Sequence, residues 1–134
     1  MEHTLAMQIV GIVLLLIGIM KNRDPIGFNK SIFGDVEGVE GGPAASMRML
    51  IGGGFAGIGL INLYCSYVFS DPLYIELDST MPSEAVLVGT AIGLTVVFAT
   101  IIGAKLRGFL DHIPTPPMII FPSLIAICLY SVLI

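Results

Sequence analysis

Four long apolar segments dominate this sequence, and they cover residues 4–20, 47–69, 85–104 and 117–134. Each is close to the roughly 20 residues that a helix needs to cross a hydrocarbon core. Their only charged residue is Arg48, at the edge of the second segment, where its long side chain can reach the interface. A backbone inside a bilayer must satisfy its own hydrogen bonds. We therefore predict an all-α integral membrane four-helix bundle made of two transmembrane hairpins.

The composition supports a membrane environment. The chain has 134 residues, of which 55% are hydrophobic and 12% charged, and it fits a single transmembrane domain spanning residues 1–134. A soluble domain of this size could not bury so much apolar surface. Six basic residues, confined to connections, are too few for a nucleic-acid footprint. The expected partner is the lipid bilayer, and no nucleic acid is expected.

The basic residues predict the orientation. All of them lie in or beside the first and third connections: Lys21, Arg23, Lys30, Arg48, Lys105 and Arg107. The positive-inside rule places these connections in the cytoplasm and both termini on the opposite side, in a bacterial inner (plasma) membrane. The first segment is expected to stay in the protein, because its basic cluster follows the apolar stretch, unlike in a signal peptide. Cys65 and Cys128 are expected to be buried thiols, with a disulfide as the alternative.

The first connection contains a candidate helix. Asp24-Pro25 offers an N-cap followed by proline at the first helical position. Apolar residues then recur at four-residue spacing, namely Phe28, Ile32 and Val36, with Phe33 beside them. We predict a short amphipathic helix in the cytoplasmic headgroup region, ending near residues 34–38, where glycines accumulate. A plain surface loop is the alternative.

The other two connections differ in character. The outer one, residues 70–84, is acidic and predicts a brief extended segment, because apolar residues alternate at Leu73, Ile75 and Leu77. Its carboxylates match no EF-hand spacing. The third is a tight turn with Gly108 after the third span and three prolines before the fourth: Pro114, Pro116 and Pro117. Pro122 is expected near the first turn of the fourth helix.

The stretch Gly52-Gly53-Gly54-Phe55-Ala56-Gly57 has the spacing G-x-G-x-x-G of a dinucleotide-binding turn. Only three residues separate Arg48 from the first glycine, which leaves no room for the strand that such a turn requires. On a helix, Gly53 and Gly57 instead form a G-x-x-x-G pair, and Gly89 and Gly93 form another. We predict that the second and third spans pack through these faces, or that one of them docks on a partner protein.

Chemically active groups are sparse within the spans. Asn62 is a full amide at membrane depth, and it is expected to hydrogen-bond a neighbouring helix, with ligand binding as the alternative. The absence of an ionisable side chain at bilayer depth argues against a proton relay. His3 and His112 are expected on opposite sides of the membrane. We predict no catalytic, cofactor-binding or metal-binding residues, no cofactor and no enzymatic activity.

A group at the inner face stays open as a weaker candidate. Arg48, Arg107, Asp111 and His112 could meet around a headgroup-level pocket. Interhelical salt bridges and side chains that extend to the interface are the simpler interpretation.

Two stretches, "RMLIGGGFAGIGL" and "GAKLRGFLDHIP", resemble a family of small four-span bacterial membrane proteins that has no assigned function. The matching positions are an arginine before paired glycines, at Arg48, Gly52 and Gly53, and a basic residue before a glycine, at Arg107 and Gly108. The resemblance covers the last two-thirds of the chain, and the long first connection fits less well. It implies the four-span architecture and adds no catalytic residue.

Three functions follow as hypotheses. The first is a non-enzymatic accessory or structural subunit that packs against a larger membrane complex, or against itself, through small-residue helix faces. The second is a small bundle that binds or passes a hydrophobic small molecule or lipid, with Asn62 and the threonines lining the pocket. The third is a membrane enzyme acting through Arg48, His112 and Asp111.

Overall fold

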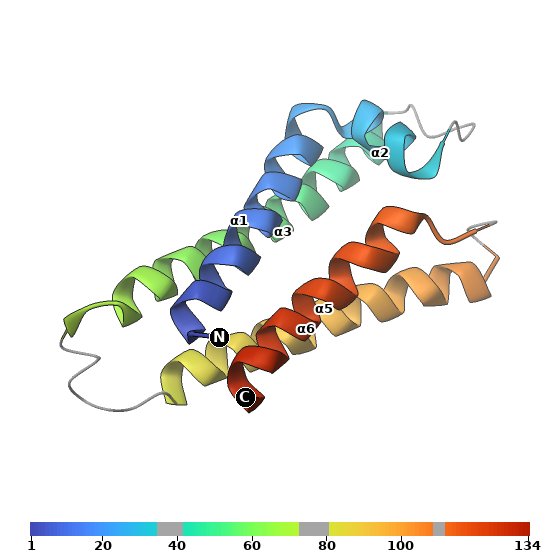
Figure 1. Ribbon diagram of the computed structural model, residues 1–134. Helices are drawn as coiled ribbons and strands as arrows, with labels where there is room; N and C mark the ends of the chain where they lie inside the picture. The colour runs from blue at the N-terminus through green and yellow to red at the C-terminus, as the bar shows by residue number, and fades with distance from the viewer. Residues whose placement is uncertain (35–41, 73–80, 109–111) are drawn as a thin grey trace.

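The computed structural model describes residues 1–34, 42–72, 81–108 and 112–134. These residues form five α-helices and no strand. The helices are α1 (His3–Arg23), α2 (Pro25–Phe33), α3 (Gly42–Phe69), α5 (Met81–Leu106) and α6 (Thr115–Leu133). Figure 1 shows two hairpins, α1 with α3 and α5 with α6, and the short α2 at one end. The predicted all-α four-helix bundle is confirmed.

Four of these helices are long and apolar enough to cross a membrane. The candidate spans are His3–Arg23, Met47–Phe69, Pro82–Gly103 and Thr115–Leu133, within a few residues of the predicted segments. Between 17% and 33% of each span is buried inside the protein, so most of its surface must face another medium. Large apolar side chains such as Leu16, Leu60 and Ile92 are more than half exposed on that surface. These features are typical of an integral membrane protein, because lipid is the solvent that suits such a surface.

The predicted helix in the first connection is confirmed as α2. The Asp24 carboxylate accepts a hydrogen bond of 2.9 Å from the Gly27 N–H, and Pro25 occupies the first helical position. Gly34 ends the helix with a φ of 77°, a conformation that glycine adopts without a Cβ penalty. Val36 lies outside the described residues, and the location of α2 at a membrane surface stays a prediction.

The third connection begins as predicted but ends earlier. Gly108, just after α5, has a φ of 78°, whereas Pro116 and Pro117, predicted to precede the fourth helix, lie in the first turn of α6. Pro122 was expected near the first turn but lies eight residues into α6, because the helix already begins at Thr115. Its missing N–H leaves the carbonyl four residues earlier without the usual helical donor. The extended segment predicted for the outer connection falls outside the described residues.

The closest helix contact joins α1 to α3 through glycines. A Cβ atom built on Gly18 would lie 2.5 Å from the Gly52 carbonyl oxygen, and one on Gly59 would lie 2.7 Å from the Gly11 carbonyl oxygen. Ala56 also faces Gly18. The glycines are seven residues apart in each helix, so they occupy one face of each and pair in antiparallel register. The two backbones approach closely because no side chain separates them.

The prediction that the second and third spans pack through their G-x-x-x-G faces was wrong. A Cβ atom on Gly53, Gly57, Gly89 or Gly93 would meet nothing within 4 Å. The rotation of α3 about its own axis explains the difference. Its buried positions recur at intervals of three and four residues, at Gly52, Phe55, Gly59, Asn62 and Ser66. This face turns the neighbouring Gly53 and Gly57 outward.

The two hairpins meet around a core of interlocking apolar side chains. Buried positions again recur at intervals of three and four residues, the pattern of a bundle whose helices cross at a shallow angle. The main contributors are Met7, Val10 and Leu14 of α1, Leu87, Ala91 and Leu94 of α5, and Phe121, Leu124 and Cys128 of α6.

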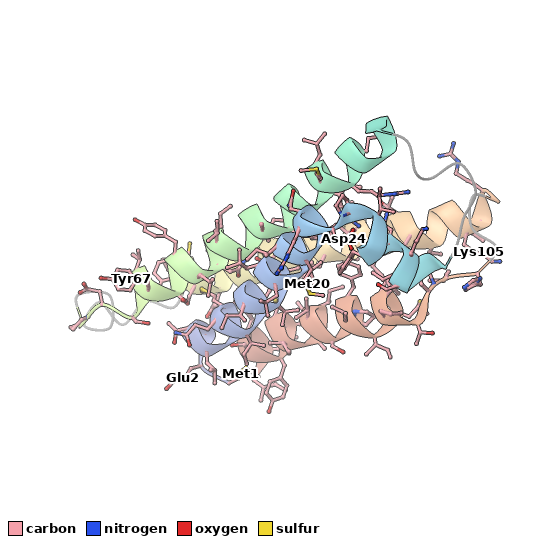
Figure 2. All side chains as sticks on the ribbon, turned by 90° about the horizontal axis from the view of Figure 1, so that it is seen from above. Met1, Glu2, Met20, Asp24, Tyr67 and Lys105 are labelled. Atoms are coloured by element: carbon pink, nitrogen blue, oxygen red, sulfur yellow. The ribbon has the colours of Figure 1, made fainter. Side chains whose placement is uncertain are left out.

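The basic residues are confined to one end of the bundle. All six basic residues lie at the end that carries α2, in α2, in the last turns of α1 and α5, near the start of α3 and just after α5. Both chain termini lie at the other end, where the Ser131 hydroxyl donates a 2.8 Å hydrogen bond to the Met1 carbonyl. Figure 2 shows Met1 and Glu2 far from Lys105. The assignment of the two ends to the sides of a membrane stays a prediction.

The glycine contact can be tested by two matched substitutions in α3. Gly59→Ala should lower the free energy of unfolding by about 1–3 kcal/mol, because its methyl group would press on the backbone of α1. Gly57→Ala, with open space around it, should leave stability unchanged or raise it by up to about 1 kcal/mol through helix propensity. Heating in detergent with a thiol-reactive dye would report unfolding through the exposure of buried Cys128. Equal midpoints for the two variants would contradict the α1–α3 contact.

Candidate functional site

A cavity of about 470 Å³ lies between the hairpins at the end that carries α2. Ligand pockets commonly enclose about 300–1,000 Å³. All five described helices contribute to its wall. The lining residues are Ile17, Lys21, Phe28, Ile32, Ile51, Gly54, Phe55, Ile58, Val97, Thr100, Ile101, Pro116, Pro117, Ile120 and Phe121.

The cavity lies where the core between the hairpins stops. In α1 the buried apolar residues end at Leu14, and in α5 they end at Leu94, so both series stop short of the α2 end. Phe55 and Phe121 meet across the space, with ring centroids 5.7 Å apart and ring planes 33° apart. In Figure 1 the hairpins also diverge toward α2. Incomplete packing of the two hairpins therefore creates the cavity.

Helix α2 supplies the outer wall. Phe28 and Ile32 lie one turn apart on the apolar face that the sequence analysis predicted, and both line the cavity and are half-buried. Prolines at the start of α6, Pro116 and Pro117, complete this end. The apolar face of α2 thus packs over an internal space of the bundle.

The cavity opens sideways between α3 and α5. Besides Pro116 at the start of α6, three lining residues are exposed on the outer surface: Ile51, Gly54 and Thr100. A Cβ atom on Gly54 would meet nothing within 4 Å, which shows how open this edge is. In a bilayer such an opening faces the acyl chains of the surrounding lipids.

Polar groups in the described lining are limited to Lys21 and Thr100. The Thr100 hydroxyl is already used, since it donates a 2.8 Å hydrogen bond to the Val96 carbonyl. Lys21 donates a 3.3 Å hydrogen bond from Nζ to Asn29 Oδ1, and Nζ lies 5.5 Å from the centroid of the Phe28 ring. A single ammonium group therefore stands in an otherwise apolar wall.

Asn62 forms the interhelical hydrogen bond that the sequence analysis expected. It is 1% exposed, and its Nδ2 donates to Thr90 Oγ1 of α5 at 3.1 Å and to the Ile58 carbonyl at 3.0 Å. The alternative that Asn62 and the threonines line a pocket was wrong for this cavity, to which only Thr100 belongs. Asn62 instead forms a hydrogen bond between the first hairpin and the second.

The inner-face candidates are only partly described. Arg48 is half-buried in α3, whereas Arg107 and His112 are exposed at the same end of the bundle. Asp111 lies outside the described residues. Nothing in this arrangement assigns a reaction to the four residues.

The remaining sequence candidates are dispersed. Cys65 and Cys128 are free thiols, the first half-buried and the second buried. His3 contacts Ser83 at the terminal end, with 2.7 Å between Nδ1 and Oγ, far from His112. Among the described residues, no three His, Cys, Asp or Glu side chains gather into a possible metal site.

Comparison with protein-family models, curated proteins and solved structures found no match. The resemblance to a family of four-span bacterial membrane proteins therefore stays a prediction. The function must be argued from the geometry of this chain.

Sequence reasoning missed the cavity, although one signal pointed toward it. Phe28 and Ile32 form an apolar face that needs a partner, and the analysis assigned that partner to the membrane surface. Lys21 was interpreted only as part of the positive-inside pattern. No periodicity within one helix shows that the two hairpins pack incompletely.

Proposed function

We propose that this protein binds a hydrophobic small molecule or lipid within the bilayer. The observation that carries the proposal is the apolar cavity of about 470 Å³ with its opening between α3 and α5. Its wall offers few groups to which water could hydrogen-bond, and a buried water needs two to four such partners. An apolar chain matches the wall better than a hydrated solute does.

The contacts of the cavity wall support the same proposal. Apolar side chains that border an empty space lack the dispersion contacts that an occupant would give them. The lateral opening makes a chain from the bilayer the most accessible occupant.

Gly54→Leu tests the proposal, because the new side chain would project into open space at the mouth of the cavity. We expect the wild-type protein, purified in mild detergent, to retain a lipid-like molecule detectable by native mass spectrometry. Gly54→Leu should lower its occupancy at least severalfold.

Gly53→Leu is the matched control, since it makes the same change one residue away, at an open position outside the cavity lining. It should retain wild-type occupancy. Wild-type protein free of any bound molecule, or equal occupancy in the two variants, would contradict the proposal.

A second candidate function is an accessory or structural subunit of a membrane complex, which is not an enzyme. The open glycine faces favour it, because a Cβ atom added to Gly53 or Gly57 of α3, or to Gly89 or Gly93 of α5, would meet nothing within 4 Å. Small residues allow close approach of a further helix, from another subunit or from a second copy.

Assembly of the paired variant Gly53→Leu/Gly57→Leu tests this candidate. Bulky side chains on this face should release any co-purifying chain, or reduce self-association, without lowering the stability of the bundle itself. Gly89→Leu/Gly93→Leu would examine the face on α5 in the same way. Unchanged assembly in both variants, judged by sizing and mass spectrometry, would rule out these faces as interfaces.

We infer that the basic end of the bundle faces the cytoplasm of a bacterial inner membrane, with both termini on the other side. The segregation of all six basic residues to one end supports this orientation. A phosphatase that is active only outside the cytoplasm should work when fused after Ile134. A reporter that fluoresces only in the cytoplasm should stay dark there, and the opposite pattern would reverse the inferred topology.

A further inference from the structure

We propose that the occupant of the cavity is an anionic lipid, with an acyl chain between the hairpins and its anionic head group against Lys21. This inference rests on the proposed binding function and adds the chemical class of the ligand. It is carried by the position of one ammonium group at the end of an apolar space.

Lys21 is positioned at the boundary between the cavity and the basic end of the bundle. It belongs to the last turn of α1, is half-buried and lines the cavity. The cavity extends from there past Ile17 to Phe55 and Ile58, deeper in the bundle. A lipid with its head at this end and its chain directed inward would have the orientation of the surrounding bilayer.

The protein satisfies this ammonium group only in part. An ammonium has three N–H donors, and in the described structure Lys21 uses Asn29 Oδ1 as a neutral acceptor and the Phe28 ring as a cation–π partner. A charge within an apolar wall is costly unless an opposite charge accompanies it. An anionic head group would supply both the missing charge and further acceptor oxygens.

Two charged side chains on neighbouring segments, Asp24 and Arg48, affect the choice of head group. The Asp24 carboxylate caps α2 through the Gly27 N–H and is exposed, so α2 already engages it. Arg48 is a second cation whose charge acts on Lys21, and it makes interactions of its own. The positive potential around Lys21 favours an anionic head group over a zwitterionic one.

Titration of the full-length protein in detergent with two lipids tests the inference. Phosphatidylglycerol and phosphatidylcholine with identical acyl chains differ in net head-group charge, and native mass spectrometry reports the fraction of protein bound to each. The wild type should prefer phosphatidylglycerol by about fivefold or more, the effect expected of one lysine near an anionic lipid. Lys21→Gln should lose this preference while its affinity for phosphatidylcholine is unchanged.

Two further variants make the result specific. Arg23→Gln removes the same charge two residues along α1, from an exposed side chain outside the cavity lining, and should keep the preference. Lys21→Arg should keep it as well, because the positive charge remains. A thermal midpoint close to that of the wild type would show that each variant is folded.

The outcomes separate this inference from the proposed function. If Gly54→Leu binds both lipids as the wild type does, the proposal that lipid binds in this cavity is wrong. If Gly54→Leu abolishes binding but Lys21→Gln retains the preference, only the head-group inference is overturned. If Lys21→Gln lowers the affinity for both lipids equally, the head-group inference is also overturned. Lys21 would then act by holding α2 through Asn29 and not by selecting an anionic head group.

Discussion

Direct contact between the backbones of α1 and α3 is the interaction on which the rest of the bundle depends. Gly11 and Gly18 meet Gly59 and Gly52 where any side chain would collide with a carbonyl group. In lipid, where water does not drive helices together, such close packing is a main source of association energy. The contact also sets the rotation of α3, which directs Phe55 toward the second hairpin and the remaining glycines toward the outside.

The hairpins then pack unevenly along their length. Near the chain termini, apolar side chains interlock, and Asn62 bonds to Thr90 across the interface. Toward α2 the interlocking stops, and the cavity occupies the space between Phe121 and the apolar face of α2. The well-packed half holds the hairpins together, which allows the other half to stay open toward lipid. The well-packed end of the interface therefore supports the structure, and the proposed lipid binding is assigned to the other end.

Several features of the fold were predictable because they obey local rules. An aspartate before a proline caps α2, and Gly34 ends it, since these residues satisfy or relax the helix termini. The hydrogen bond of Asn62 followed from the cost of an unpaired amide in an apolar medium. The glycine interface was not predicted, because the G-x-x-x-G rule uses four-residue spacing, whereas the contact uses glycines seven residues apart in both helices. That longer spacing was present in the sequence and could have indicated the pairing.

The order of residues along the chain was sufficient to locate the four spans, the short helix α2 and the confinement of the basic residues to one end. These properties depend on the length of apolar runs, on capping residues and on connections, all of which are local. Folding in three dimensions selected the face of α3 that packs on α1, the opening beside Gly54 and the place of Lys21 in the cavity wall. Each residue turns a helix by about 100°, so a face points inward or outward according to how all the helices pack at once.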